Sequence, residues 1–182
     1  MIPAYFSLKG YPINVIGRNL PEDRINGILQ GIRNGKNIRV IDKGSSLLET
    51  VRCLKRGETL GILMDLNTRS DGFDIDFFGK PAHTPSGPIL LSYKTGAPLL
   101  PLAIHRTPLN RHRIVVGEEV QAMTNENPGT SSVQVKNKIR SNGVDENQLK
   151  EMTFLCSKAI ETFIRQHPTE WFWMHEKWKE RK

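Results

Sequence analysis

Long apolar runs and cysteines are both scarce in this sequence of 182 residues. No stretch reaches the ~20 apolar residues that a membrane-spanning helix needs. The first residues, MIPAYFSLKG, lack the basic segment and apolar run of a secretory signal. Cys53 and Cys156 form no CxxC motif and have no pairs of histidines nearby. The sequence therefore predicts neither a zinc site nor a disulfide framework, and it fits a reducing compartment.

Acidic residues are outnumbered, with 19 Asp and Glu against 26 Lys and Arg, which gives a formal charge of +7. A basic balance suits a phosphate-bearing partner, such as nucleic acid, an anionic membrane surface or an anionic small molecule. For an excess of this size, a solvated basic surface is the commoner explanation. With 37% hydrophobic and 25% charged residues, the chain is typical of a globular domain.

The first half of the chain alternates strand-like and helix-like segments. Apolar spacing and turn residues predict strands over 11–19, 38–42 and 59–66, and helices over 20–37 and 45–58. Residues 59–66 are almost wholly apolar, which is typical of a strand buried on both faces. This β-α-β-α-β order predicts an open, mixed but largely parallel α/β sheet flanked by helices.

The second half is less regular, and we treat residues 1–182 as one domain. Residues 71–87 are interpreted as a loop-rich passage, and residues 124–145 as a polar loop or insert without an apolar period. The remaining predicted elements are a helix over 85–96, a buried strand over 97–105 beside a second strand over 112–120, and a long helix over 146–167.

Asp65 is the most informative residue at a predicted strand end. Ligands of open α/β sheets bind at the carboxyl ends of the strands, and Asp65 follows the apolar run LGILM. Such a carboxylate either caps a turn or faces a site, and the turn cap is the commoner explanation.

Several cations occupy similar positions. Arg18 follows the first predicted strand, and His105 and Arg106 close the predicted strand over 97–105. Together with Arg33 and Lys36, Arg18 and Arg106 can form a cationic cradle for phosphate. Independent surface charges are the alternative for each of them.

A series of motifs in fixed order resembles the lipid A biosynthesis (lauroyl/myristoyl) acyltransferase family, which is related to the glycerol-phosphate acyltransferases. The resemblance covers nearly the whole chain. It rests on VIGR ending at Arg18, IRNGK around Arg33, LKRG at 54–57, Asp65, FFGKPAHTPSG at 77–87, TGAPLLP at 95–101, Arg106 and EWFWMHEKWK at 170–179.

The resemblance implies a glycerol-phosphate acyltransferase-like fold and transfer of a fatty acyl chain from acyl carrier protein or another thioester. The acceptor would be a hydroxyl of a lipid A precursor or related glycolipid, in lipopolysaccharide synthesis. It further implies no cofactor and no metal, and a place at the cytoplasmic face of the bacterial inner membrane. Acyl-acyl carrier protein, the glycolipid acceptor and the membrane surface are then the partners, and nucleic acid is not expected.

The resemblance also assigns roles to residues. Asp65 would support the catalytic site, and Arg18, Arg33 and Arg106 would hold phosphate of the lipid or of the carrier's pantetheine arm. Within the FFGKPAHTPSG motif, the residues expected to shape the acyl pocket are Phe78, Gly79, Thr84 and Gly87.

The general base of the wider superfamily is a His in a His-x-x-x-x-Asp/Glu motif, upstream of the first strand. Only His175 has an acid, Glu180, five residues on. In a helix these two side chains would point ~140° apart, so we interpret the match as a coincidence. We therefore expect the base before Met1, and the chain as the carboxyl-side portion of the enzyme, truncated at the amino terminus and lacking the family's membrane helix. The histidines without such an acid are His83, His105, His112 and His167.

All three tryptophans lie within WFWMHEKW, residues 171–178. Trp favours places with one apolar and one wet side, and Lys stems lie along apolar surfaces. The segment therefore either closes the core or faces lipid headgroups, and we favour core closure. The residues given this structural or membrane-facing role are Trp171, Trp173, His175, Trp178 and Lys179.

Two other hypotheses remain open. A basic nucleic-acid-binding module would match the charge, but the aromatic residues cluster at the end of the chain and do not alternate with Arg. A non-catalytic fragment that folds without transferring acyl groups would match the missing His motif.

Overall fold

The computed structural model describes residues 1–17, 38–42, 47–67, 71–120 and 145–178, with Gly27 and Gly31. Two compact units make up the described chain, one within residues 1–62 and one from residue 63 onward. Nearly all of the predicted helix over 20–37 and of the predicted insert over 124–145 lies outside the described residues. The single domain over 1–182 stays a prediction.

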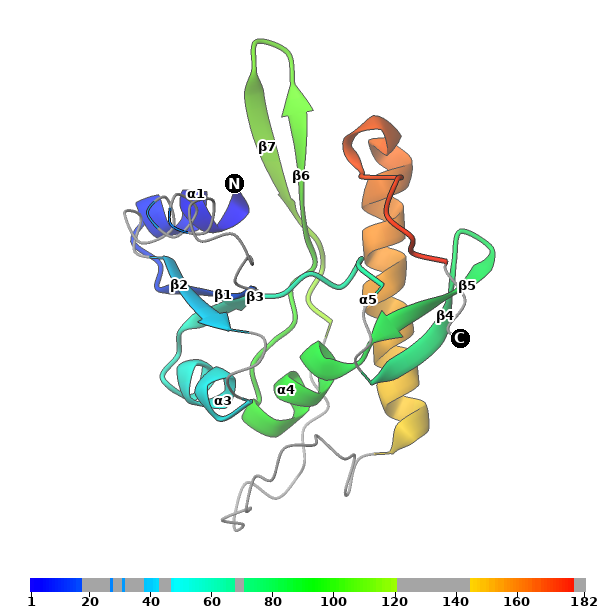
Figure 1. Cartoon of the computed structure of the whole chain (residues 1–182), viewed down its shortest axis with the longest axis horizontal. Helices are drawn as coiled ribbons and strands as arrows, with labels where there is room; N and C mark the ends of the chain where they lie inside the picture. The colour runs from blue at the N-terminus through cyan, green and yellow to red at the C-terminus, as the bar shows by residue number, and fades with distance from the viewer. Residues whose placement is uncertain are drawn as a thin grey trace. The chain divides into compact units, whose positions relative to one another are not determined.

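The first unit is built on a parallel sheet in the order β2-β1-β3. Ile13 of β1 lies opposite Ile38 of β2 and Thr59 of β3, which confirms the predicted parallel pairing. Ile13 and Ile38 are buried on the sheet, and Cys53 is buried on α3. The elements, shown in Figure 1, are α1 (Ile2–Leu8), β1 (Ile13–Gly17), β2 (Ile38–Asp42), α3 (Leu47–Lys55) and β3 (Thr59–Gly61).

The third strand is shorter than the sequence predicts. β3 ends at Gly61, and Leu63 beyond it is 68% exposed. The prediction of a strand over 59–66 is therefore wrong beyond Gly61, and burial on both faces is wrong throughout, because Thr59 is exposed and Leu60 and Gly61 are only half-buried. Apolar content alone did not reveal that the chain leaves the sheet there.

The second unit begins with a hairpin of β4 (Gly72–Phe77) and β5 (Lys80–Pro85), where the sequence predicts a loop. The loop prediction is wrong, because GFDIDF alternates apolar and acidic residues with the period of a strand. Phe78 and Gly79 close the hairpin with φ values of 56° and 77°. Two consecutive positive φ values match the twist of a tight hairpin turn.

Two helices form the core of the second unit. α4 (Gly87–Thr95) ends at Gly96, whose φ of 72° is the left-handed cap that glycine adopts most readily. α5 (Glu146–Gln166) begins at Asp145, whose carboxylate accepts a hydrogen bond from the Asn147 N–H at 2.9 Å. Ile89 and Leu90 of α4 pack against Leu149 and Met152 of α5. Both helices are predicted from the sequence at nearly these bounds.

A second hairpin, β6 (Leu102–Thr107) and β7 (Arg111–Val116), forms a separate antiparallel sheet. The predicted pairing is confirmed, but the strand predicted over 97–105 begins only at Leu102 and is not buried, since Leu100 is 52% exposed and Leu102 is 36% exposed. Arg106 lies inside this strand and not at the end of a parallel one, so its predicted position is wrong. The described residues thus form a mixed α/β protein whose parallel part is confined to the first unit.

The chain after α5 makes one 3-10 turn, Pro168–Glu170, and then continues without regular helix through Trp178. The helix assumed for His175 is therefore wrong. Within the part of the chain that the structure describes, no helix is long and apolar enough to cross a membrane.

Candidate functional site

Asp65 lies in a loop, residues 63–67, that is hydrogen-bonded to the terminal segment, residues 171–178. The Trp171 indole N–H donates to the Asp65 carboxylate at 2.9 Å. The backbone N–H of Asn67 donates to His175 Nε2 at 2.7 Å, and its side-chain amide donates to the Glu176 carbonyl at 3.0 Å. The terminal segment therefore fixes the loop on which Asp65 sits.

Lys177 lies beneath this loop and is the most deeply buried charged residue of the described chain, with 1% of its surface exposed. Its ammonium donates to the His83 carbonyl at 3.1 Å, and longer contacts of 3.4 Å reach the Met64 carbonyl and the Thr84 hydroxyl. Burial lowers the pKa of Lys177 to about 8, although the negative charge of Asp65 acts in the opposite direction. A cation is thus held close behind the Asp65 loop.

The tryptophans close an aromatic core, as favoured from the sequence. Trp171 and Trp178 pack against a buried cluster that includes Phe77. The Trp178 indole N–H donates to the Phe77 carbonyl at 3.1 Å, so its polar atom is satisfied inside the protein. Trp173 is different, since it is 46% exposed, and neighbouring Phe172 is 67% exposed. The segment therefore closes the core at both ends and exposes apolar side chains between them.

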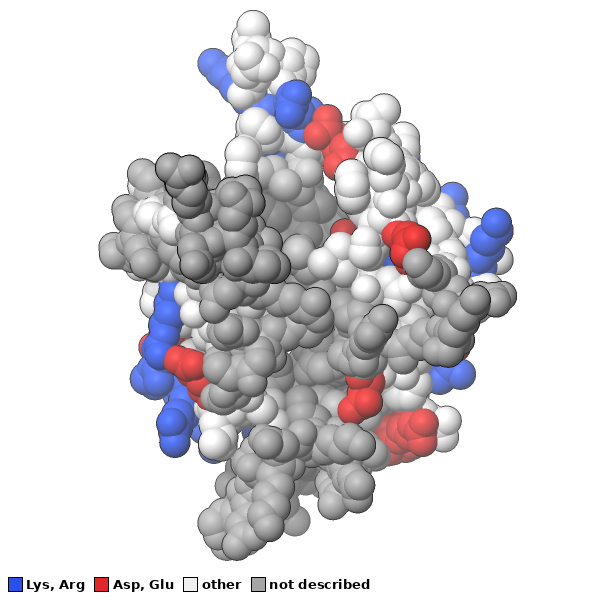
Figure 2. Space-filling model, in the orientation of Figure 1, with Lys and Arg blue, Asp and Glu red and all other residues white. Residues whose placement is uncertain are grey.

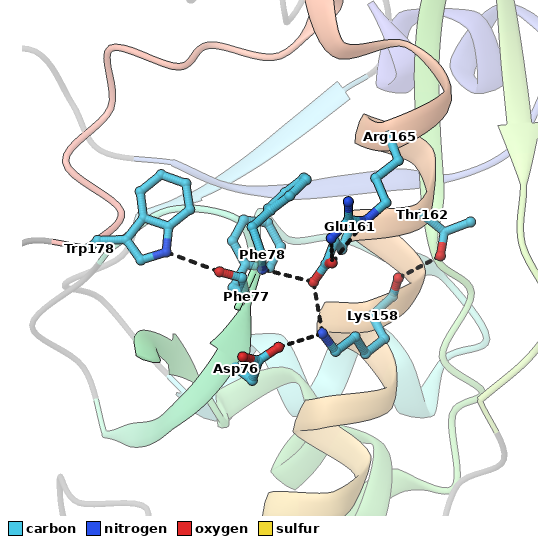
Figure 3. A network of polar contacts seen from close by, with 8 residues as sticks. All are labelled: Asp76, Phe77, Phe78, Lys158, Glu161, Thr162, Arg165 and Trp178. Carbon is cyan, nitrogen blue, oxygen red and sulfur yellow. Dashed lines mark hydrogen bonds and ion pairs between the residues drawn. The ribbon is translucent and has the colours of Figure 1, made fainter. Parts of the chain in front are cut away.

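A network of charges attaches the β4–β5 turn to α5 (Figure 3). Glu161 is 5% exposed and accepts a hydrogen bond from the Phe78 N–H at 3.0 Å. Lys158 and Arg165 pair with the same carboxylate at 2.9 Å and 2.5 Å, and Lys158 also reaches Asp76 at 2.6 Å. Burial alone would raise the pKa of Glu161, but the Phe78 N–H and the two cations lower it to about 2.

His83 and Asp74 face each other across the same hairpin, with His83 Nδ1 3.4 Å from Asp74 Oδ1. His83 is 8% exposed, and its ring lies against Gly72, where a Cβ would come within 2.9 Å of Nε2. The glycine therefore makes room for the imidazole. Because the ring is enclosed in this way, the pair stabilises the hairpin and does not present an open base.

A shallow groove runs between β4 and the first turns of α5. Carboxylates dominate its polar lining, so it does not suit a phosphate or another anion. Its lining residues are Asp74, Ile75, Asp76, Asn147, Lys150, Glu151 and Phe154. Among the described residues no cluster of His, Cys, Asp and Glu has the arrangement of a metal site.

The structure brings some of the sequence-predicted site residues together and separates others. The Thr84 hydroxyl accepts a hydrogen bond from the Lys177 ammonium, and the negative charge of Asp65 acts to raise the pKa of Lys177. Thr84 is only 1% exposed. Phe78 and Gly79 form the β4–β5 turn, whose Phe78 N–H donates to Glu161. Gly87 is the first residue of α4. Arg106 is exposed on β6. Arg18, Arg33 and Lys179 lie outside the described residues.

Sequence reasoning missed Lys177 and Glu161. It named Lys179 in the terminal motif but not Lys177, which is buried. Glu161 carried a weak signal, because Lys158 and Arg165 stand three and four residues away on the same helix face. Nothing in the sequence indicated that Glu161 accepts a hydrogen bond from the backbone of a hairpin turn.

The chain is thus a mixed α/β protein in which the Asp65 loop and the buried Lys177 lie beside the aromatic core. The model of the bacterial lipid A biosynthesis acyltransferase family matches residues 4–180. The chain therefore belongs to this family, and the resemblance stated from its motifs is confirmed. No curated protein matches the chain.

Proposed function

We propose that this chain takes part in transfer of a fatty acyl group from acyl carrier protein, or another thioester, to a hydroxyl of a lipid A precursor or related glycolipid. The observation that carries the proposal is the family match over residues 4–180. The position of Asp65 supports it, since the terminal segment holds the Asp65 loop by four hydrogen bonds, counting the longer one from Lys177 to the Met64 carbonyl.

The reaction makes one ester and breaks one thioester. The acceptor hydroxyl oxygen attacks the thioester carbonyl, the new C–O bond forms, and the C–S bond breaks with release of the carrier thiol. A general base accepts the hydroxyl proton, which is the usual task of a His assisted by a carboxylate. We assign that base to a His outside these 182 residues.

Asp65 is assigned a supporting role at this site. Its carboxylate accepts a hydrogen bond from the Trp171 indole N–H and lies in the field of the Lys177 ammonium. A carboxylate fixed in this way can orient a basic group or a substrate hydroxyl. Thr84 and Phe78 support the same region from the β4–β5 hairpin, through Lys177 and the aromatic core.

Phosphate binding is assigned to Arg18, Arg33 and Arg106, and the enzyme to the cytoplasmic face of the bacterial inner membrane. Its partners there would be acyl-acyl carrier protein and the glycolipid acceptor. Family membership supports these assignments, because lipid A biosynthesis acts on membrane lipids.

Asp65→Ala and Asp65→Asn test the site together. The amide of Asn can still accept the Trp171 N–H but carries no charge, whereas Ala loses both properties. We expect both variants to lose at least about 100-fold in acyl transfer, because the reaction needs the charge. The assay measures acyl transfer from acyl carrier protein by the chain together with any segment that precedes it in its gene.

The two variants separate a catalytic role from a structural one. If Asp65→Asn keeps near wild-type activity while Asp65→Ala melts early, Asp65 only positions the terminal segment and its assignment to the site fails. Transfer by the 182-residue chain alone would contradict the assignment of the base to a residue outside it.

A further inference from the structure

The β6–β7 hairpin carries a basic surface of which the proposed site uses only Arg106. Residues 102–116, LAIHRTPLNRHRIVV, contain three arginines and two histidines but no acidic residue. Arg106, Arg111 and Arg113 are all exposed. Such a concentration of one sign of charge on a single element favours an anionic partner.

The tip of this hairpin is apolar. Leu109 is 85% exposed and has a φ of 66°, and Asn110 follows with 56°. A positive φ is costly for leucine and ordinary for asparagine or glycine. The turn therefore carries a strained residue whose side chain contributes little to the core, and such strain points to a use at the tip.

The arginines surround the tip on both faces of the hairpin. His105 lies opposite Arg113, and Thr107 lies opposite Arg111, so Arg111 and Arg113 share one face. Arg106 lies opposite His112 on the other face. Side chains alternate between the faces of a strand, which places guanidinium groups on both sides of Leu109.

The hairpin is attached to the end of α5 within the same unit, both along β6 and where the hairpin begins. The rings of His105 and His167 stack with centroids 3.7 Å apart, at an interplanar angle of 8°. Gly117 donates to the Pro101 carbonyl at 2.8 Å, where a Cβ would come within 3.1 Å of Phe163. The tip projects beyond this attachment in Figure 1, and Figure 2 shows Lys and Arg side chains on that projection.

We propose that the β6–β7 hairpin docks on an anionic lipid surface, with Leu109 entering the acyl boundary and the arginines binding headgroup phosphates. Arginine pairs with phosphate in two-point geometry, and a basic element gains affinity for each charge near an anionic leaflet. A soluble polyanion such as nucleic acid or an acidic protein would use the arginines but would not need a strained, exposed leucine between them. The apolar tip therefore favours lipid.

Vesicle flotation tests this docking with the full chain. We expect the protein to float with vesicles of phosphatidylcholine mixed with phosphatidylglycerol, and not with pure phosphatidylcholine. Leu109→Asn should weaken binding roughly ten-fold or more, because it removes the apolar insertion. The same variant should melt at an equal or higher temperature, because Asn adopts a positive φ more readily. A leucine that served only the fold would give the opposite result.

The arginine and leucine substitutions each have a matched control variant. The triple variant Arg106→Ser, Arg111→Ser, Arg113→Ser should lose roughly 100-fold in vesicle binding, at about five-fold for each arginine. Its control replaces the exposed Lys55, Lys94 and Lys150 by Ser, which removes the same charge elsewhere. Leu48→Asn, at a leucine 43% exposed on α3, is the control for Leu109.

Three results would overturn the proposal. One is flotation of Leu109→Asn like the wild-type protein. Another is an equal loss in the lysine control. The third is equal binding of double-stranded DNA to the wild-type protein and to Leu109→Asn, with displacement of the vesicles. That outcome would make the hairpin a site for soluble polyanions. Flotation involves no acyl transfer, so the result does not depend on the proposed reaction.

Discussion

Lys177 shows how one buried cation connects three parts of the second unit. Its ammonium reaches carbonyls from the Asp65 loop and from β5, and it lies 5.4 Å from the centroid of the Phe77 ring. Taking an ammonium out of water costs free energy, which its hydrogen bonds and the nearby carboxylate offset only in part. The lowered pKa of about 8 is the sign of that remaining cost.

This cost gives a pH dependence that Lys177→Met should remove. The pKa of Lys177 falls from 10.5 in the unfolded chain to about 8 in the folded one. Between those values the unfolded state binds more protons, so Lys177 makes stability rise with pH. The rise has an upper limit of about 3 kcal/mol. The measurement is the free energy of unfolding of both proteins between pH 7 and pH 10.5.

The difference between the two profiles isolates Lys177 from other groups. Burial raises the pKa of the Cys156 thiol to about 11, so Cys156 acts in the opposite direction over part of this range. It does so equally in both proteins. If the wild-type protein and Lys177→Met gave parallel profiles, the ammonium of Lys177 would not be buried in solution.

At the scale of elements, the β4–β5 hairpin and α5 are joined through a single carboxylate. Glu161 satisfies a turn N–H and two cations at once, and Arg165 also lies over the Phe78 ring at 4.6 Å. The turn carries a positive φ at Phe78, which side chains rarely adopt. Contacts from α5 therefore hold a conformation that the turn would not favour by itself.

Glu161→Gln should destabilise the protein by about 2 kcal/mol or more at pH 7, because two cations lose their buried partner. The pKa of Glu161 is about 2, below its ordinary 4.5, so its stabilisation is complete above pH 4.5 and is lost as the pH falls toward 2. The difference in stability between the wild-type protein and Glu161→Gln should therefore shrink as the pH falls. Thermal melting at pH 7 and pH 3 measures it.

Glu151→Gln is the matched control, since Glu151 is an exposed glutamate on the same helix. Its effect should stay within about 0.5 kcal/mol at both pH values. An equal effect of the two substitutions would show that the network contributes no more than an exposed charge does.

At the scale of the whole molecule, the parallel sheet has open edges within the described residues. β2 and β3 each pair only with β1 there, and β3 has three residues. An unpaired strand edge is a template for another chain. We expect the isolated chain to self-associate or to be poorly soluble.

Size-exclusion chromatography with light scattering tests this expectation over a range of protein concentrations. Mass should rise with concentration, and thermal unfolding should be broad. A sharp monomer peak at all concentrations, with cooperative melting, would contradict it.

The sequence by itself determined the elements whose signal is local. Pro85, Ser86 and a terminal glycine predicted α4, and apolar spacing predicted α5, because a helix is specified by its caps and by residues three and four apart. The same local signals predicted the parallel β1–β2 pairing. Ordered motifs then predicted the family, which the match over residues 4–180 confirms.

Tertiary structure alone decided which polar groups meet. Trp171 and Asp65 are separated by 106 positions, and Lys177 and His83 by 94, so no local pattern links them. It also decided that Lys177 is enclosed while Glu176 beside it is exposed, because burial depends on what packs over a side chain from elsewhere. The prediction of a strand over 59–66 failed for the same reason, since β3 ends at Gly61 although its partner β1 continues to Gly17, and no local pattern marks that point.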